Sequence, residues 1–405
     1  MSALTYLEKL LDGAEIEWSN LGRLCDIFTG GEAPQNHIKG DTPTSDCRYP
    51  IYGNGAEIYG YADNYRIGQD AVTISSIGAN TGTIYFRKAF FTPIIRLKVV
   101  IPKHSWLLPR YLFHYLSSQT IYSKSSSVPN MNASDVKKLG IPIPCPHNPE
   151  KSLAIQSEIV RILDTFTALT AELTAELSTR KKQYNYYRDQ LLSFNEGQVE
   201  WKTLGDVTKK WYSGGTPTAG KAEYYDNGDI PWLRTQEVKF SDIDSTEIKI
   251  TQAALKNSAA KWIPENCVII AISGATAGRS AINKIPLTTN QHCGCLEIDD
   301  TKALYRYVFH WVSFNYENIK FLGQGARGDL NSTIIKNFRL PIPYATDPDK
   351  SLEEQARIVE ILDKFDTLTN SITEGLPREI ELRQKQYEYY RDLLFSFPKT
   401  EAVTD

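Results

Sequence analysis

The chain has 405 residues, 41% of them hydrophobic, and a formal net charge of −3, which suits two or three domains with a sizeable core each. No apolar run is long enough to cross a bilayer, and acidic residues replace the basic start of a signal peptide, so we expect a cytoplasmic protein without membrane contact. The six cysteines form no Cys-x-x-Cys pair, which favours reduced thiols and argues against a metal site. The charge gives no global sign of nucleic-acid binding, although DNA phosphates require only a local basic face.

The first part of the chain predicts a short N-terminal segment, residues 1–17, and a mixed α/β domain, residues 18–150. Residues 72–75 are rich in β-branched side chains and lead into a glycine-bounded turn, residues 78–82, which is typical of a strand and its exit. Residues 109–122 are apolar at helical spacing and predict a helix.

Residues 151–197 predict one long helix, because apolar side chains recur in alternating steps of three and four residues. This spacing is the heptad seam of a coiled coil. A helix over residues 151–194 would be roughly 65 Å long at about 1.5 Å per residue. Within it Thr-Ala-Glu-Leu occurs twice in tandem, at residues 170–177, and each unit adds roughly 6 Å, so we interpret it as a length adjuster. The expected seam residues are Ile159, Ile162, Phe166, Leu169, Leu173 and Leu177.

Residues 198–347 predict a second mixed α/β domain, which matches the first one only weakly. Residues 268–271 again predict a strand, and residues 304–322 predict a helix. The glycine-bounded turn recurs at residues 274–278, where it aligns with residues 78–82 but carries different side chains.

Residues 348–397 predict a second long helix, followed by a tail, residues 398–405. Residues 355–369 repeat residues 156–170 closely, and a Gly-x-Pro sequence at residues 375–377 predicts a kink or break. Two matching seams on one chain predict antiparallel packing as a rigid rod. The alternative, that each helix lies on its own domain, fits less well, because the apolar stripe is narrow and long. The expected seam residues are Ile358, Ile361, Phe365, Leu368 and Ile372.

The chain therefore alternates a variable unit with a near-identical unit, twice. We predict an α+β fold in which two mixed α/β domains are separated by two long antiparallel coiled-coil helices. A pseudo-twofold internal repeat relates the halves. Domains that share a frame but differ in content are expected of a protein that reads two different sites.

Two phosphate-binding patterns occur, and both lack the context that they need. Gly323-x-Gly325-x-x-Gly328 follows a helical stretch and not the strand of a βαβ unit. Residues 215–221 resemble a P-loop, but Ala222 stands where the magnesium-binding Ser or Thr belongs. Known motifs of methyltransferases, nucleophile elbows and metalloproteases are missing, and the histidines share no metal-ligand spacing, so we interpret His114 and His310 as structural. We predict no catalytic residue, no cofactor and no metal in this chain.

Glycine loops with amide, hydroxyl and basic side chains indicate DNA contacts, because such loops let backbone approach a ligand closely. Arginine suits the guanine edge, and glutamine or asparagine suits the adenine edge. For any single residue, an ordinary solvated loop explains the pattern equally well. The candidate contacts are Asn54, Asn80, Thr81, Lys124, Ser126 and Asn130 in the first domain, and Arg234, Thr235, Gln236, Thr276, Arg279, Gln324 and Arg327 in the second.

Three motifs, each present twice, carry a resemblance to a known family. They are Trp-x-x-Leu-Gly at Trp18 and Trp201, the Pro-Ile-Pro exits at residues 142–144 and 341–343, and the helical Gln-x-x-Ile-Val-x-Ile-Leu-Asp. Together they resemble the specificity subunits of type I restriction-modification enzymes over the whole chain. The helical segments, with their tandem Thr-Ala-Glu-Leu, are similar to the conserved regions of the IC subclass.

This resemblance implies a non-catalytic subunit with two target-recognition domains, which binds double-stranded DNA and two modification (methyltransferase) subunits. Through the complex it also implies ATP-dependent restriction subunits. S-adenosylmethionine, ATP and Mg²⁺ are then expected in the partner subunits. An asymmetric bipartite target is implied, with one half-site per domain and a spacer set by the helices. Because residues 6–18 resemble residues 191–201, we expect the chain ends to meet in a circular arrangement.

Two other classes of protein remain open on the residues alone. A stand-alone nucleotide-dependent methyltransferase or nuclease would need the glycine patterns to bind a cofactor. A coiled-coil scaffold without sequence preference would share the helices but would not need base contacts.

Overall fold

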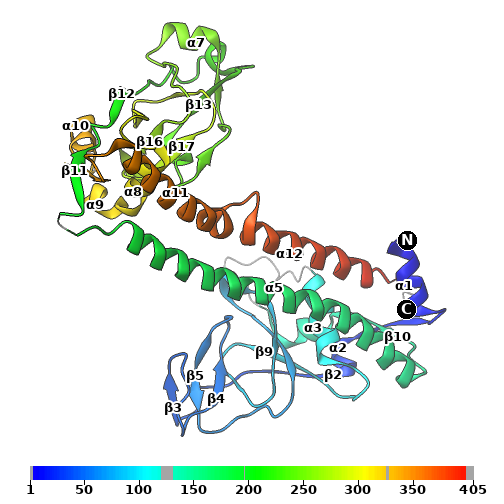
Figure 1. The fold of residues 1–405 in the computed structure, drawn as a ribbon. Coiled ribbons are helices and arrows are strands. Elements are labelled where there is room, and N and C mark those ends of the chain that lie inside the picture. The colour runs from blue at the N-terminus through cyan, green and yellow to red at the C-terminus, as the bar shows by residue number, and fades with distance from the viewer. Residues whose placement is uncertain (1–2, 120–130, 196, 325–327, 398–405) are drawn as a thin grey trace. The chain divides into compact units, whose positions relative to one another are not determined.

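The computed structural model describes residues 3–119, 131–195, 197–324 and 328–397. The chain divides into two compact units: unit 1 comprises residues 1–173 with 380–405, and unit 2 comprises residues 174–379. Each unit holds a mixed α/β domain and parts of the long helices (Figure 1). The units divide the long helix between them and do not isolate it as a separate domain. None of the helices in the described part of the chain is long and apolar enough to span a membrane.

Two four-stranded sheets build the first domain. In the sheet β2-β9-β6-β7 all pairs are antiparallel, and the central strands β6 and β9 are buried, as expected for the apolar run at residues 72–75. The second sheet, β3-β5-β4-β8, ends in a parallel pair. The strands are β2 (Cys25–Thr29), β3 (His37–Lys39), β4 (Tyr49–Tyr52), β5 (Ile58–Ala62), β6 (Ala71–Ile74), β7 (Ile84–Arg87), β8 (Thr92–Pro93) and β9 (Lys98–Pro102), and the helices are α1 (Ala3–Leu11), α2 (Leu21–Leu24), α3 (Pro109–Ser118) and α4 (Ala133–Lys137).

The second domain repeats this plan with sheets β12-β19-β16-β17-β14 and β15-β13-β18. The helical stretch expected over residues 304–322 is confirmed as two helices that are divided at Asn315, whose side-chain amide donates to the carbonyl of Trp311. The strands are β12 (Thr208–Tyr212), β13 (Ile230–Leu233), β14 (Asp242–Ile243), β15 (Lys249–Ile250), β16 (Val268–Ala271), β17 (Ser280–Asn283), β18 (Thr288–Thr289) and β19 (Cys293–Ile298), and the helices are α6 (Ala222–Tyr225), α7 (Gln252–Asn257), α8 (Tyr305–Phe314), α9 (Tyr316–Phe321) and α10 (Ser332–Lys336).

The start and the exit of each domain pair with each other in a two-stranded ladder. Strand β1 (Ile16–Asn20) pairs with β10 (Gly140–Pro144), and β11 (Val199–Thr203) pairs with β20 (Arg339–Pro343). Trp18 lies opposite Pro142, and Trp201 lies opposite Pro341, so the two ladders have the same register. Proline lacks an N–H donor and is tolerated because each ladder has only edge strands. The recurring Trp and Pro-Ile-Pro motifs therefore lie on the two paired strands of the same ladder.

The near-identical units form long helices. Helix α5 (Pro149–Leu191) is continuous, and it ends three residues earlier than the expected limit. The second copy is divided into α11 (Pro348–Asn370) and α12 (Gly375–Leu394), which confirms the predicted break. Ile372 lies between these helices and is 79% exposed. Its assignment to the seam was wrong, because the break turns it out of the helical stripe.

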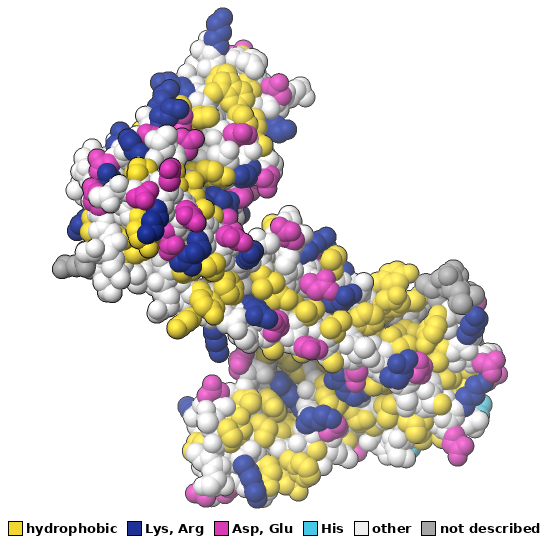
Figure 2. All heavy atoms as spheres, viewed as in Figure 1, with side chains coloured by type: hydrophobic (Ala, Val, Ile, Leu, Met, Phe, Trp, Pro, Cys, Tyr) yellow, Lys and Arg dark blue, Asp and Glu magenta, His cyan; other side chains and the backbone are white. Residues whose placement is uncertain are grey.

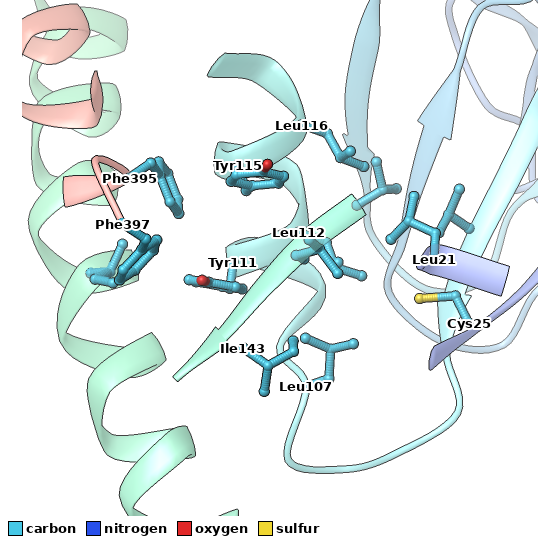
Figure 3. Close-up of a cluster of buried hydrophobic side chains, with 14 of the residues drawn as sticks. Leu21, Cys25, Leu107, Tyr111, Leu112, Tyr115, Leu116, Ile143, Phe395 and Phe397 are labelled. Atoms are coloured by element: carbon cyan, nitrogen blue, oxygen red, sulfur yellow. The ribbon is translucent and has the colours of Figure 1, made fainter. Parts of the chain in front are cut away.

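The first turns of α5 pack into the core of unit 1. Ile159 belongs to one buried cluster with Tyr111 of α3, with Leu7 of the N-terminal helix, and with Phe395 and Phe397 near the C-terminus. Figure 3 shows Phe395 and Phe397 facing Tyr111 and Tyr115, and the ring centroids of Tyr111 and Phe395 are 5.5 Å apart. In unit 2 Ile358 lies in the corresponding cluster. At these two seam positions each long helix thus packs on its own domain. The sequence had favoured packing of the two helices against each other.

Further along the helices, aromatic rings join the two copies. In unit 1 Phe166 of α5 stacks on Tyr390 of α12, with 5.2 Å between centroids. In unit 2 Tyr187 of α5 stacks on Phe365 of α11, with 5.5 Å between centroids. The remaining expected seam residues are half-buried: Ile162, Leu169, Leu173, Leu177, Ile361 and Leu368.

One partly buried carboxylate in each unit ties the domain to its long helix. In unit 1 Asp164 of α5 accepts hydrogen bonds from Arg110 and from His114 of α3, whose Nε2 lies 2.7 Å from Oδ1. The other ring nitrogen of His114, Nδ1, lies 3.0 Å from the hydroxyl of Tyr387 on α12. A neutral imidazole that donates from Nε2 and accepts at Nδ1 satisfies both partners.

Unit 2 repeats this group of side chains. Asp363 of α11 accepts from Arg306, at 2.6 Å, and from Nε2 of His310, also at 2.6 Å. A second carboxylate, Asp242, also pairs with Arg306. The prediction that His114 and His310 are structural agrees with these contacts, and we call the two groups the Asp164 and Asp363 hubs.

The electrostatics of the Asp164 hub follow from its burial. Burial lowers the pKa of His114, Arg110 lowers it further, and the hydrogen bond with Asp164 opposes both effects. Burial raises the pKa of Asp164, but the hydrogen bonds from His114 and Arg110 outweigh it, so its pKa lies below the ordinary value. At neutral pH the hub therefore consists of an ionised Asp164, a charged Arg110 and a neutral His114.

We expect the free energy of unfolding to fall as the pH drops below about 6.5, where an unfolded histidine takes up its proton. Because the pKa of His114 is lowered in the fold, its contribution is present at neutral pH and is lost as the pH falls. His114→Gln should therefore flatten the slope, by at most about 1.4 kcal/mol per pH unit for one site. Urea unfolding across this pH range measures it, with the exposed His147→Gln as control. Equal slopes for His114→Gln and the unsubstituted chain would contradict the assignment.

Candidate nucleic-acid interface

The two glycine-bounded turns have the same backbone geometry. Each begins after a buried central strand, as the 3-10 turns η1 (Gly78–Asn80) and η3 (Gly274–Thr276). The Gly82 amide donates to Ser75, and the Gly278 amide donates to Ala271, both at 2.8 Å. The first glycine of each turn has φ near the left-handed region, +73° and +74°, which favours glycine.

These turns carry different side chains. In the first domain Asn80 is exposed, and the hydroxyl of Thr81 donates to the carbonyl of Gly78 at 2.7 Å. In the second domain Thr276 and Arg279 are half-buried at the corresponding turn, and Ala277 replaces Thr81. Asn80 is therefore the most accessible of the expected contacts on these turns.

Asn54 and Thr235 occupy the same place in the two domains. Each lies shortly after a strand that pairs in parallel with a short partner, β4 with β8 and β13 with β18. The structure brings Asn54 to the first turn: its Oδ1 accepts from the Ser76 amide at 2.6 Å, and its Nδ2 donates to the Ile77 carbonyl at 2.5 Å. The Asn54 amide, which we expected to contact a base, thus already forms hydrogen bonds with the backbone of this segment.

Arg234 and Gln236 lie together, but acidic side chains surround the guanidinium. Nη2 of Arg234 lies 2.6 Å from Glu247, and Nε lies 3.8 Å from Glu237. With its amide turned so that the oxygen faces Arg234, Gln236 accepts from Nη1 at 2.9 Å. Burial raises the pKa of Glu237, and the charge of Arg234 opposes that rise. A guanine contact from Arg234 would require it to leave Glu247.

In each domain, a residue that follows the late candidate contacts (the late loop, residues 124–130 and 324–327) bonds to the backbone beside the turn. The Met131 amide donates to Ser76 at 2.9 Å, and the Leu330 amide donates to Ile272 at 2.7 Å. Gln324 is exposed, and its backbone bridges to Asp329, whose carboxylate accepts from the Gly274 amide at 3.4 Å. Four expected contacts, Lys124, Ser126, Asn130 and Arg327, lie outside the described residues.

Basic side chains do not gather into one patch on the face drawn in Figure 2. Lysines and arginines lie among aspartates and glutamates there. The ion pairs of Arg234 and Arg306 with nearby carboxylates agree with this mixture.

Two features of the structure were not predicted from the sequence. One is the pair of hubs, although a signal existed: Arg110-x-x-x-His114 recurs as Arg306-x-x-x-His310. The other is Arg87, a buried arginine in the first domain with no counterpart in the second, for which the sequence offered no repeated pattern.

No group of three or more metal-ligating side chains occurs among the described residues. The cysteines closest in sequence, Cys293 and Cys295, are buried and free. Burial raises the pKa of Cys293 to about 12 and also raises the pKa of Cys295. Both thiols are therefore protonated at neutral pH, whereas a metal ligand must be a thiolate.

Comparison with known proteins agrees with the duplicated architecture. The sequence profile of the type I restriction modification DNA specificity domain matches residues 14–180 and again residues 197–382. The chain is 44% identical over 418 residues to the EcoR124I/EcoR124II type I restriction enzyme specificity subunit of Escherichia coli, covering all of both chains. It is 32% identical over 419 residues to the EcoprrI specificity subunit of the same organism, covering 92% of this chain and 93% of that one.

Solved structures share the fold at low sequence identity. The S subunit of a type I restriction-modification system from M. genitalium superposes with a TM-score of 0.65 at 16% identity, and the match covers 96% of this chain and 98% of that one. The family assignment rests on two profile matches that cover most of the chain and on a relative that is 44% identical over its full length. The chain belongs to the family of type I restriction-modification DNA specificity subunits.

Proposed function

We propose that the chain reads an asymmetric bipartite DNA target, with one half-site for each domain, and scaffolds the subunits that act on this DNA. The observation that carries the proposal is the pair of glycine-bounded turns, which have the same backbone hydrogen bonds and different side chains. A common frame presents each turn in the same way, and different side chains then select different bases. Among the described residues, the candidate base contacts are Asn80, Thr276, Arg279, Gln324 and the Arg234–Gln236 loop.

The helices supply the distance between the half-sites in this proposal. Residues of α5 pack against α12 in unit 1 and against α11 in unit 2 through stacked aromatic rings. Two domains that bind the same face of a duplex must lie about one helical turn of DNA apart. The tandem Thr-Ala-Glu-Leu, together with the overall helical pattern, supports membership of the IC subclass.

Two modification subunits and, through the complex, restriction subunits are the proposed protein partners. S-adenosylmethionine, ATP and Mg²⁺ then bind those partners. A methyltransferase must take the adenine out of the stack, and that chemistry belongs to the modification subunit. A stand-alone enzyme would instead bind S-adenosylmethionine or ATP as a purified chain, and a non-specific scaffold would give the same DNA footprint on any sequence.

Two exposed tyrosines support the binding of two identical partners. Tyr186 is 62% exposed and Tyr389 is 58% exposed. Each forms an edge-on pair with the next tyrosine, Tyr187 or Tyr390, with 5.4 Å between centroids and 77° between planes in both copies. Exposed tyrosines are frequent anchors of protein interfaces. Since the surface is present twice in one form, we assign one modification subunit to each copy.

Exchange of residues 201–345 for the same region of a relative should change one half-site and leave the other unchanged. The reason is that each domain carries its own turn and late loop. Methylation profiling of a host genome that carries the system reads both half-sites at once. The reciprocal exchange of residues 18–150 should change the other half-site. An unchanged target after either exchange would sink the modular proposal.

Insertion of one further Thr-Ala-Glu-Leu after Leu177 should lengthen the tolerated DNA spacer by roughly one to two base pairs. Four helical residues add roughly 6 Å, and one base pair rises about 3.4 Å. The same methylation profile gives the spacer length. Leu177→Ala, which alters the seam without adding length, should leave the spacer as it was. A spacer that the insertion does not change would refute the role of α5 as a ruler.

Tyr186→Ala should remove one modification subunit from the complex, Tyr389→Ala should remove the other, and the double variant should remove both. Loss of an interface anchor costs about 2 kcal/mol or more, so each affinity should fall about 30-fold. Native mass spectrometry of the complex near its dissociation constant counts the bound subunits. Ile372→Ala is the control, because it removes an exposed apolar side chain outside the tyrosine pairs. Two bound subunits in the double variant would disprove this docking site.

A further inference from the structure

Arg87, at the end of β7, is a buried cation without a carboxylate partner among the described residues. It is 8% exposed, and its guanidinium lies over the ring of Tyr52, 3.8 Å from the centroid, and over Tyr85 at 4.7 Å. Its Nη2 donates to the carbonyl of Gly55 at 3.0 Å, and its Nη1 donates to Ala56 at 3.3 Å. The two rings and two carbonyls therefore replace the carboxylate that a buried arginine usually has.

The arrangement must offset the cost of burying this charge. Burial lowers the pKa of Arg87, and the contacts with Tyr52 and Tyr85 oppose that effect. Its Nε has no hydrogen-bond partner in the described part of the chain. A methionine or leucine would fill such a site without the free-energy cost of burying a charge, so the groups that the guanidinium contacts indicate its role.

What it holds is the loop that contains Asn54. Gly55 and Ala56, whose carbonyls accept from Arg87, directly follow Asn54. Asn54 then binds the segment before the turn in three ways: through Oδ1 to the Ser76 amide, through Nδ2 to the Ile77 carbonyl, and through its own carbonyl to the hydroxyl of Ser75 at 2.8 Å. The segment leads directly into Gly78, where the exposed turn begins.

The second domain holds its turn with other groups. Nδ1 of His292 lies 2.7 Å from the hydroxyl of Ser273, next to Gly274, and the Asp329 carboxylate accepts from the Gly274 amide. Asn283 occupies the strand position that corresponds to Arg87. Its side chain binds Cys267, Pro264 and Ile285, away from the turn. Among the described residues, only the first domain connects its turn to a buried arginine.

We propose that Arg87 and Asn54 are positioning residues that fix the base-reading turn of the first domain, and so determine the specificity of its half-site without touching DNA. The proposal rests on the proposed function, because it takes that turn as the reading element. Arg87 is too buried to reach a base, so an effect of its substitution on sequence preference must pass through the loop and Asn54.

The test compares methylated sequences in host genomes that carry the complete system with Arg87→Met, Arg87→Lys or Asn54→Ala. A positioned base contact discriminates by about 5- to 150-fold. We therefore expect Arg87→Met and Asn54→Ala to raise methylation at sites with a wrong base in the first domain's half-site about tenfold or more. The half-site of the second domain should stay as strict as before. Arg87→Lys keeps the charge but cannot contact both carbonyls and both rings. It should therefore raise methylation at wrong-base sites less than Arg87→Met does.

Asn283→Ala is the matched control in the second domain. It removes buried hydrogen bonds at the corresponding strand position, so it should lower the melting temperature without relaxing either half-site. Exchange of residues 18–150 first establishes which half-site belongs to the first domain. If the unsubstituted system shows no bipartite target, the proposed function itself fails.

Three outcomes would overturn the positioning role while leaving the proposed function intact. In the first, Arg87→Met and Asn54→Ala lower the melting temperature but leave both half-sites strict, which makes the residues merely structural. In the second, both half-sites relax equally, which indicates a general loss of affinity. In the third, Asn54→Ala relaxes a single base position and Arg87→Met relaxes none, which makes Asn54 a direct contact.

Discussion

The carboxylates of Asp164 and Asp363 are the constraint on which the rest of the structure depends. Each receives an arginine and a histidine that lie one turn apart on a domain helix, so each fixes the direction of the long helix against that domain. Two donors on successive turns define an orientation, which a single contact would not do. Loss of Asp164 would leave the partly buried Arg110 without its charge partner. If Asp363 were lost, Arg306 would still pair with Asp242. The recurrence of the hub in both units means that each domain is attached to its helix in the same way.

If the two turns are the DNA-reading surface, as proposed, their exposed side chains can change with little effect on the free energy of unfolding. The turns are held by backbone hydrogen bonds, by glycine conformations and by side chains from outside the turn, and none of these is an exposed side chain of the turn itself. Exposed loop positions away from the core change stability little. The central strands, by contrast, are buried, and their side chains are restricted by packing. The hubs and ladders therefore recur in both units, while the side chains of the turns differ between the two domains.

Features that depend on local periodicity were predictable, and features that depend on tertiary contacts were not. The strand at residues 268–271, the long helix over α5 and the break near Gly375 follow from apolar spacing and from glycine and proline chemistry. The helix break at Asn315 depends on a side-chain bond to the backbone, and the packing of Ile159 on the domain depends on residues far away in sequence. Arg234 was expected as a base contact from its type, but nothing in its neighbourhood along the chain indicated that Glu247 would pair with it. Residue type predicts what a side chain can bind, whereas the fold decides which partner it already has.

The pairing of arginines with carboxylates affects how strongly this chain can bind DNA phosphates. Much of the affinity of proteins for DNA comes from cations that displace counterions from phosphates. In this chain Arg110, Arg234 and Arg306 are paired with carboxylates, and Arg87 is buried. An ion pair must be broken before its arginine can contact DNA, so each such arginine contributes less than a free one. These four arginines therefore add little to phosphate binding as they stand, and the net charge of −3 supplies no general attraction for DNA. We therefore propose that partner subunits supply part of the phosphate contacts in the complex, while the two turns select the sequence.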